Sequence, residues 1–177
     1  MLTLIIPETE LYDEIRNEFT YIKQQKLTLE HSLVSLSKWE SKWHKPFLSK
    51  EEKTLDETID YIKCMTVNSV DPIVYSCINS SMIHEINQYI EDPMTATTIK
   101  DSGPPNREII TSEIIYYWMV ALQIPFECQK WHLNRLLMLI KVCNVKNKPA
   151  KKMSKRDIMS RNASLNAARR QALHTRG

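Results

Sequence analysis

The sequence predicts a mainly α protein: a compact, acidic helical domain over residues 1–145 and a basic C-terminal tail over residues 146–177, with a helix at about 155–173. Three observations support this prediction. Apolar residues recur every three to four positions through much of the chain after Ser32, which is the period of an amphipathic helix. A short alternating run near the N-terminus is typical of a strand. Charge divides unevenly between the two parts of the chain.

The β signals lie in residues 1–30. Leu2–Ile6 alternates and is followed by proline, which suits a short edge strand. Further on, Phe19–Ile22 and Leu27–Leu29 read as two strands joined by the polar link between them, although this link lacks the Asn-Gly signal of a tight turn. We therefore expect a small N-terminal β-hairpin or sheet.

The helices are expected in the order in which their start signals occur. The first is a helix after Ser32 with the stripe Leu33, Leu36, Trp39 (or Glu40) and Trp43, and the second is opened by a capping box at Ser49–Glu52 and ends near Met65. The third is started by Asp71-Pro72 and covers Ile73–Ile90, either continuously or with a break near Asn79–Ser81. The remaining helices are Glu113–Gln123, capped by Thr111 or Ser112; one from Pro125 to about Val142; and Ile158–Leu173, capped by Ser154. Glu91–Asn106 is expected to be an irregular connection.

The two strongly apolar helices, 113–123 and 126–142, are the best candidates for the centre of the core. We expect them to pack together and to bury most of the following side chains: Trp118, Leu122, Trp131, Leu136 and Leu137.

Glycine is scarce, and this scarcity excludes whole classes of site. The chain has two glycines, Gly103 and Gly177. A P-loop needs two closely spaced glycines and a dinucleotide fingerprint needs about three, so neither kind of nucleotide cradle can be present.

The tail is the most informative compositional feature. Residues 146–177 contain ten Lys and Arg against the single acid Asp157, whereas residues 1–145 contain 14 basic and 20 acidic side chains. A basic tail can bind nucleic acid or an acidic protein. It is equally typical of a solvated terminus. We expect residues 1–145 to fold without the tail, and the tail to serve in recognition.

The N-terminus has no positively charged signal-peptide region, and the longest uncharged stretch, Ile114–Phe126, is shorter than the roughly 18–20 residues that a membrane span requires. Four separate cysteines sit among apolar neighbours. We therefore expect an intracellular protein with reduced thiols and no membrane association.

Cys128 and His132 are the strongest candidates for metal or nucleophilic chemistry, because residues four apart share one face of a helix. A zinc site needs two further ligands, and no second pair is recognisable. Glu127 also disfavours a reactive thiolate. We expect no metal, no cofactor and no catalytic residues.

The segment from Trp39 to Phe47 interleaves Trp39, Trp43 and Phe47 with basic residues. Aromatic and basic side chains together can bind single-stranded nucleic acid. Large aromatics also anchor protein interfaces. The spacing of the two tryptophans fits a core stripe, and we rank this interpretation first.

Several segments together resemble the tail assembly chaperones of long-tailed bacteriophages. They are Leu33–Trp43, Pro93–Thr98, Arg107–Lys146 and the Met159–Ala163 ending with its Ala-Ala-Arg-Arg run, and they span about two thirds of the chain. None of these segments is a catalytic motif.

This resemblance implies an α-rich, non-enzymatic protein of the host bacterial cytoplasm that coats the tape measure protein before the tail tube polymerises. Family members are commonly made in a second, longer form by ribosomal frameshifting. Further expected partners are the tail tube protein and a second copy of the chain. The residues predicted to bind partners are Trp39, Trp43, Phe47, Lys151, Lys152, Arg156, Arg161, Arg169 and Arg170. The alternative is a nucleic-acid-binding protein, or another small phage virion or assembly protein, that acts through the basic tail.

Overall fold

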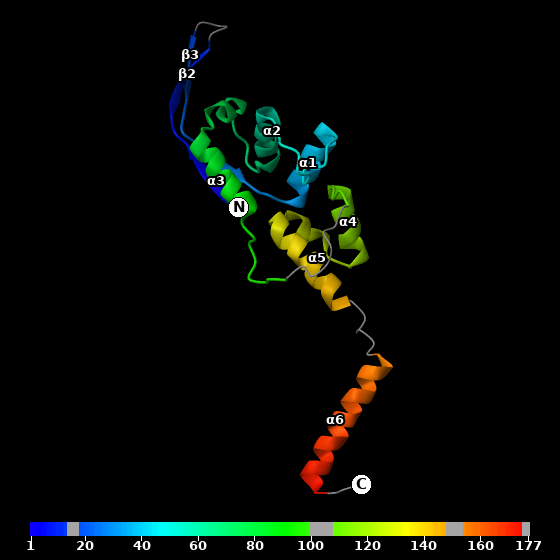
Figure 1. Cartoon of the computed structure of the whole chain (residues 1–177). Coiled ribbons are helices and arrows are strands. Elements are labelled where there is room, and N and C mark those ends of the chain that lie inside the picture. The colour runs from blue at the N-terminus through cyan, green and yellow to red at the C-terminus, as the bar shows by residue number, and fades with distance from the viewer. Residues whose placement is uncertain (14–17, 100–107, 148–153, 175–177) are drawn as a thin grey trace. The chain divides into compact units, whose positions relative to one another are not determined.

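The structure of the chain, a computed structural model, describes residues 1–13, 18–99, 108–147 and 154–174. The chain divides into two compact units, Met1–Lys146 and Asn147–Gly177. The elements are β1 (Leu2–Ile6), β2 (Thr9–Asp13), β3 (Glu18–Ile22), β4 (Gln25–Leu29), α1 (Leu33–Trp43), α2 (Leu55–Met65), the 3₁₀ helix η1 (Pro72–Cys77), α3 (Ser80–Glu91), α4 (Ser112–Ala121), the 3₁₀ helix η2 (Phe126–Lys130), α5 (Leu133–Asn147) and α6 (Lys155–Leu173) (Figure 1). The fold is mainly α with a small antiparallel β component.

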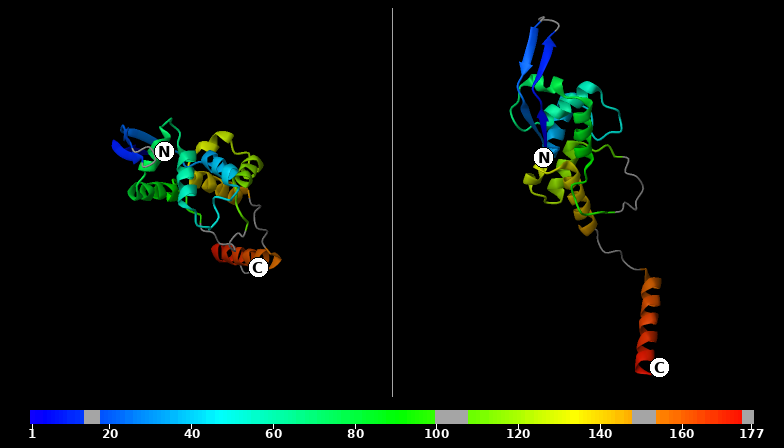
Figure 2. Two further views of the ribbon diagram at one scale, coloured as in Figure 1. Left: turned by 90° about the horizontal axis from the view of Figure 1, so that it is seen from above. Right: turned by 90° about the vertical axis from the view of Figure 1, so that its left-hand side faces the viewer.

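The four strands form two halves of one antiparallel ribbon. β1 pairs with β4 and β2 pairs with β3 in a continuous register, because Ile6 faces Gln25 and Thr9 faces Ile22. Pro7 has no N–H group to donate, which explains why the ladder is interrupted between the halves. The β2–β3 half extends beyond the helices of the first unit (Figure 1, Figure 2).

The expected hairpin between Phe19–Ile22 and Leu27–Leu29 is therefore wrong in its pairing. Both segments are strands, but each pairs with an N-terminal strand instead of with the other. This arrangement places Leu4 opposite Leu27 and buries both side chains. The short link between the two segments also lacks the residues that a two-residue turn requires.

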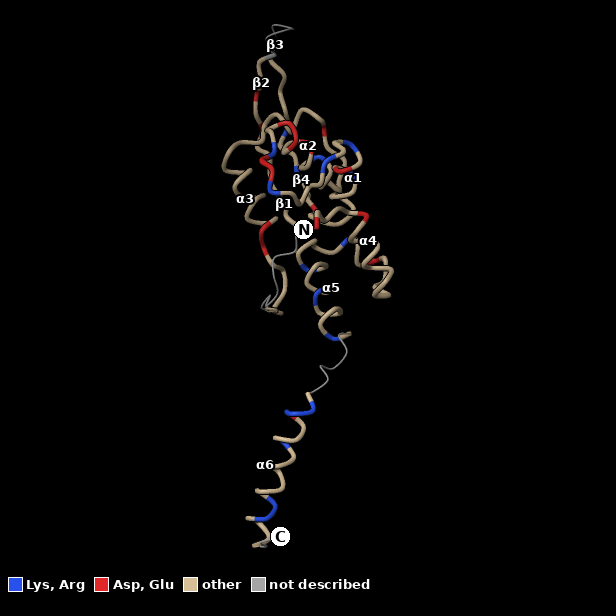
Figure 3. Tube along the Cα trace, turned by 45° about the vertical axis from the view of Figure 1, so that its right-hand side comes forward, with Lys and Arg blue, Asp and Glu red and all other residues tan. Residues whose placement is uncertain are grey.

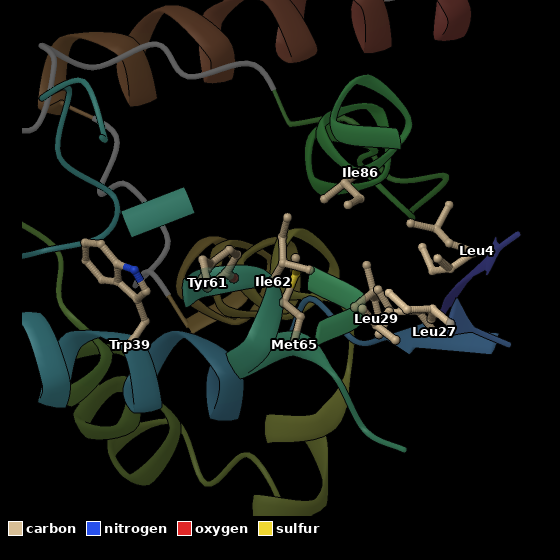
Figure 4. Close-up of a cluster of buried hydrophobic side chains, with 11 residues drawn as sticks. Leu4, Leu27, Leu29, Trp39, Tyr61, Ile62, Met65 and Ile86 are labelled. Carbon is tan, nitrogen blue, oxygen red and sulfur yellow. The ribbon is translucent and has the colours of Figure 1, made fainter. Parts of the chain in front are cut away.

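A first core cluster joins the ribbon to α1, α2 and α3. Its buried members are Leu4, Ile6, Ile22, Leu27, Leu29, Trp39, Tyr61, Ile62, Met65, Val74 and Ile86 (Figure 4). The chain leaving α2 covers the outer edge of β4, since Glu30 N–H donates to the Met65 carbonyl over 2.8 Å and Val67 N–H donates to the Thr28 carbonyl over 3.0 Å. These bonds fix α2 against the ribbon.

A second cluster lies between α1, α4, η2 and α5, and its buried members are Leu33, Leu36, Ile115, Met119, Ile124, Cys128, Leu133, Leu136 and Ile140. Helix α1 contributes to both clusters. Of the five side chains expected at the core centre, Leu136 is fully buried, whereas Trp118, Leu122, Trp131 and Leu137 are half-buried. The core is therefore shared between two clusters instead of being centred on the two apolar helices.

Two expected helix boundaries are wrong. The Ser49–Glu52 box does not open α2, which begins at Leu55 with Thr54 as its N-cap and Glu57 completing the capping box. The helix expected from Pro125 is divided into η2 and α5. It breaks because Leu133 N–H donates to the His31 carbonyl over 2.9 Å, which ties the backbone at the start of α5 to the connection before α1.

Other helix signals are confirmed. Ser32 caps α1, Asp71 caps η1, and the break near Asn79 separates η1 from α3, which Asn79 caps. Ser154 caps α6. In the expected irregular connection, residues 92–99 are non-helical, and residues 100–106 lie outside the described part of the chain.

The observed start of α2 makes a direct prediction. Replacing Thr54 by alanine should lower the free energy of unfolding by about 1 kcal/mol, because its Oγ1 accepts a hydrogen bond from Glu57 N–H over 3.2 Å. Ser49→Ala should change it by less than about 0.5 kcal/mol. Urea denaturation of the two variants checks this prediction. A larger loss of stability for Ser49→Ala than for Thr54→Ala would indicate that the helix begins at the Ser49–Glu52 box.

Candidate partner-binding surfaces

The two tryptophans of α1 both bond to α2. Trp39 is 1% exposed, and its Nε1–H donates to the Glu57 carbonyl over 2.9 Å. Trp43 is half-buried, and its Nε1–H donates to Asp60 Oδ2 over 3.0 Å. Because both indole N–H groups donate hydrogen bonds to α2, the main role of the two tryptophans is to hold α2 against α1.

Phe47 completes this aromatic group after the chain reverses. His44 ends α1 in the left-handed conformation (φ 53°), which turns the following residues back over the helix. The Phe47 ring stacks on Tyr61 at a centroid distance of 3.9 Å and meets Trp39 edge-on at 5.1 Å. The geometry favours the core interpretation of the segment and leaves partly exposed faces of Trp43 and Phe47 at the surface.

The basic residues between these aromatics are paired with acids of α2. Lys42 forms an ion pair with Asp60, and Lys45 Nζ lies 2.6 Å from Glu57 Oε1. The hydrogen bonds from Lys45 and from Thr54 N–H hold the pKa of Glu57 below its ordinary value. Burial acts to raise the pKa of Asp60, but hydrogen bonds from Lys42 and Trp43 outweigh it and lower the pKa. Cations engaged in this way are poorly placed to bind phosphate.

The tail residues predicted to bind partners lie on α6, apart from two that the structure does not describe. Arg156, Arg161, Arg169 and Arg170 are exposed residues of α6. Figure 3 shows the basic positions of this helix in blue. Lys151 and Lys152 lie outside the described residues. The helix begins after Ser154, whose Oγ accepts from Asp157 N–H over 3.1 Å.

Apolar and basic side chains share the surface of α6. Ile158 and Leu165 are seven residues apart, and Arg169 follows one turn later, so the helical period places all three on one side. The exposed fractions of the apolar side chains are 44% for Ile158, 73% for Met159, 46% for Leu165 and 70% for Leu173. This combination suits an acidic surface with an apolar groove.

The Cys128–His132 pair does not form the shared helical face that the spacing predicts. Cys128 lies in η2, and His132 lies between η2 and α5. His132 Nε2 donates to the Tyr89 carbonyl over 2.9 Å, and burial raises the pKa of the Cys128 thiol. Among the residues that the structure describes, no three His, Cys, Asp or Glu side chains are grouped to hold a metal.

Glu40 is a structurally important residue that the sequence signalled only weakly. Its buried carboxylate accepts from Phe47 N–H over 2.9 Å through Oε1 and from Ser112 N–H over 2.7 Å through Oε2. It thereby satisfies a backbone donor at the start of α4 and ties this helix to α1. The sequence signal for this role was a glutamate at a position of the apolar stripe of α1, where a charged side chain is unusual.

Two exposed apolar surfaces were not predicted. On the ribbon, Tyr12 and Phe19 form a ring pair with centroids 5.0 Å apart, and both are exposed. On α4 and η2, the exposed side chains are Tyr117, Val120 and Phe126. Aromatic residues of this kind are enriched in protein interfaces.

The candidate surfaces lie on a mainly α protein that has a small β ribbon and an exposed basic helix, α6. None of the described helices has the length and apolar character needed to cross a membrane. The chain matches no protein-family model, and no curated protein or solved structure matches it.

Proposed function

We propose that the chain is a non-enzymatic tail assembly chaperone of a long-tailed bacteriophage. It binds the tape measure protein in the cytoplasm of the host bacterium and promotes assembly of the tail tube. The observation that carries the proposal is α6, a helix of 19 residues that is exposed along its whole length and carries both basic and apolar side chains.

An exposed helix with apolar side chains supports a role in recognition. Most helices in proteins draw their stability from tertiary packing of an apolar face. The apolar residues of α6 are available for such packing against a partner, in the way that an amphipathic helix occupies a groove. The alanine-rich sequence of α6 also lowers the cost of ordering it on binding.

The resemblance to phage tail assembly chaperones supplies the identity of the partner. A tape measure protein is a long helical protein and can offer acidic and apolar surface along its length. The tail tube protein and a second copy of the chain are further partners in this proposal. Lys151 and Lys152 precede α6 in the sequence and add to the positive charge of the tail.

The alternative function is nucleic-acid binding, or another role in phage assembly, through the same tail. The observation that favours it is the charge of α6, on which Asp157 is the single acid among five Lys and Arg. Non-specific DNA binding weakens steeply as salt rises because counterions are released from phosphates. This salt dependence allows the two functions to be distinguished.

A truncation after Asn147, where α5 ends, tests the proposal. We expect the truncated chain to keep its melting temperature within a few degrees, because every residue of α6 is exposed in the full chain. We also expect it to lose affinity for recombinant tape measure protein in isothermal titration calorimetry. If the truncated chain unfolds, the tail is part of the core. If its affinity for the tape measure protein is unchanged, the first unit contains the recognition surface.

Charge variants give a matched control. Replacing Arg156, Arg169 and Arg170 by glutamine should weaken tape measure binding, whereas glutamine at three exposed lysines of the first unit, Lys23, Lys26 and Lys50, should not. Tight binding of the full chain to duplex DNA, with a steep salt dependence and no binding to the tape measure protein, would favour the alternative.

A further inference from the structure

A pocket of about 230 Å³ lies between α2 and α3, and we call it the α2–α3 pocket. The residues that line it include Phe47 and Lys53 before α2, Ile62 on α2, and Ile83, Ile86 and Ile90 on α3. Figure 4 shows Ile86, on α3, above Ile62 of α2. The two helices thus supply opposite apolar walls.

One helical face of α3 supplies an apolar wall of the α2–α3 pocket. Ile83, Ile86 and Ile90 follow the i, i+3, i+7 spacing of one helical face. On α2, Leu55 is seven residues before Ile62 and therefore lies on the same side of the helix, and it is 68% exposed. Leu55 therefore adds one exposed apolar side chain to the side of α2 that carries Ile62.

Lys53 is the charged side chain among the described residues that line the pocket. Its Nζ lies 4.5 Å from the centre of the Phe47 ring, and burial lowers its pKa. In the described part of the chain, no carboxylate lies within ion-pair distance of this ammonium group. The nearby Glu57 is already bound by Lys45 and by Thr54 N–H. The ammonium group is therefore partly buried against the Phe47 ring, and the carboxylates of Glu57 and Glu51 act on it through longer-range attraction.

The size and charge of the α2–α3 pocket restrict its occupant. Its volume is below the roughly 300–1,000 Å³ of pockets that hold drug-sized molecules, so it suits a single side chain better than a cofactor. Lys53 repels basic segments and attracts carboxylates. A partner segment that carries an apolar side chain next to an acidic residue matches both the small apolar pocket and the positive charge of Lys53.

We propose that the α2–α3 pocket seats an apolar anchor side chain of a partner protein, with a neighbouring carboxylate of that partner paired to Lys53. The site is separate from the basic tail, and its existence does not depend on the proposed function. It gives the first unit a recognition surface of its own.

The test uses the full chain with ¹³C-labelled isoleucine δ1 methyl groups and N-acetyl-L-leucine as the probe, which combines an aliphatic side chain with a carboxylate. Titration should shift the methyl signals of Ile62, Ile83, Ile86 and Ile90 and leave those of Ile115 and Ile140, in the second core cluster, unchanged. Lys53→Met should weaken binding by about fivefold while binding of the neutral N-acetyl-L-leucinamide stays the same. Ile83→Trp, which fills the pocket, should abolish the shifts.

Three results would overturn the proposal. The first is a set of shifts spread equally over both groups of isoleucines. The second is equal or tighter binding of the cationic L-leucinamide, which would indicate a basic occupant such as the tail. The third is a concentration-dependent dimer in sedimentation that Ile83→Trp dissociates, which would assign the pocket to a second copy of the chain. The melting temperature of each variant is measured first, so that loss of the fold is recognised.

Discussion

Lowering the pH from 7 to 5 should reduce the free energy of unfolding by about 2 kcal/mol, and lowering it to pH 3.5 should reduce it by about 4 kcal/mol, because of His31. Burial, together with the nearby His132, lowers the pKa of His31 to about 3. In the unfolded chain its pKa is about 6.5. The unfolded state therefore binds more protons between these two values, so stability is complete above about pH 6.5 and is lost as the pH falls towards 3.

The surroundings of His31 explain why the charged form is disfavoured. The side chain is 2% exposed, and its Nδ1 lies 2.6 Å from Tyr61 Oη. The His132 ring is 5.0 Å away between centroids, and its Nδ1 has no hydrogen-bond partner among the described residues. Burial also lowers the pKa of His132, so its protonation acts in the same direction.

Equilibrium denaturation in urea at several pH values checks this prediction. His31→Asn keeps a polar group near Tyr61 Oη and should remove most of the pH dependence between 7 and 5, whereas His84→Asn, at an exposed position, should not. The carboxylates Glu57 and Asp60, whose pKa values are lowered, contribute only at lower pH. A pH profile that is unchanged in His31→Asn would show that another group is responsible.

Local sequence signals predicted the elements of this chain better than their connections. Asp71 and Ser154 cap their helices as predicted, because a cap acts within one turn of the backbone. The same local signal at Ser49 gave a wrong helix start, since Thr54 caps α2 instead. The strand segments were likewise visible as runs of apolar and β-branched residues. Their pairing was not, because it depends on which segments bury their apolar faces together, and this is decided by contacts distant in sequence.

The same limit applies to the break before α5. An unbroken apolar period from Pro125 onward predicts one helix, but the bond from Leu133 N–H to the His31 carbonyl and the bridge between Ser32 and His132 interrupt it. These partners are separated by about a hundred residues in the chain. No local pattern identifies them.

The candidate surfaces also differ in how far the sequence alone could predict them. The basic tail was visible from charge alone, because composition is additive along the chain. The α2–α3 pocket was not visible, because its two walls come from different helices and Lys53 meets them only in the folded protein. For Trp39, spacing alone could not separate a core position from an interface position, whereas its exposed fraction of 1% does.

Trp39→Ala should lower the free energy of unfolding by about 3–5 kcal/mol, because it removes the largest fully buried side chain of the first core cluster. It also leaves the Glu57 carbonyl without the indole N–H that it accepts. Trp39→Phe keeps part of the ring packing and should cost less. The measurement is the midpoint of urea denaturation at neutral pH.

Tyr117→Ala is the matched control, because this aromatic residue is also on a helix but is 68% exposed. Its effect on stability should stay within about 0.5 kcal/mol. The comparison also decides how Trp39 relates to partner binding. If Trp39→Ala binds the tape measure protein weakly and is also destabilised, the loss follows from the fold. If instead it keeps full stability and loses binding, the buried position of Trp39 is wrong, and this tryptophan contacts the partner directly.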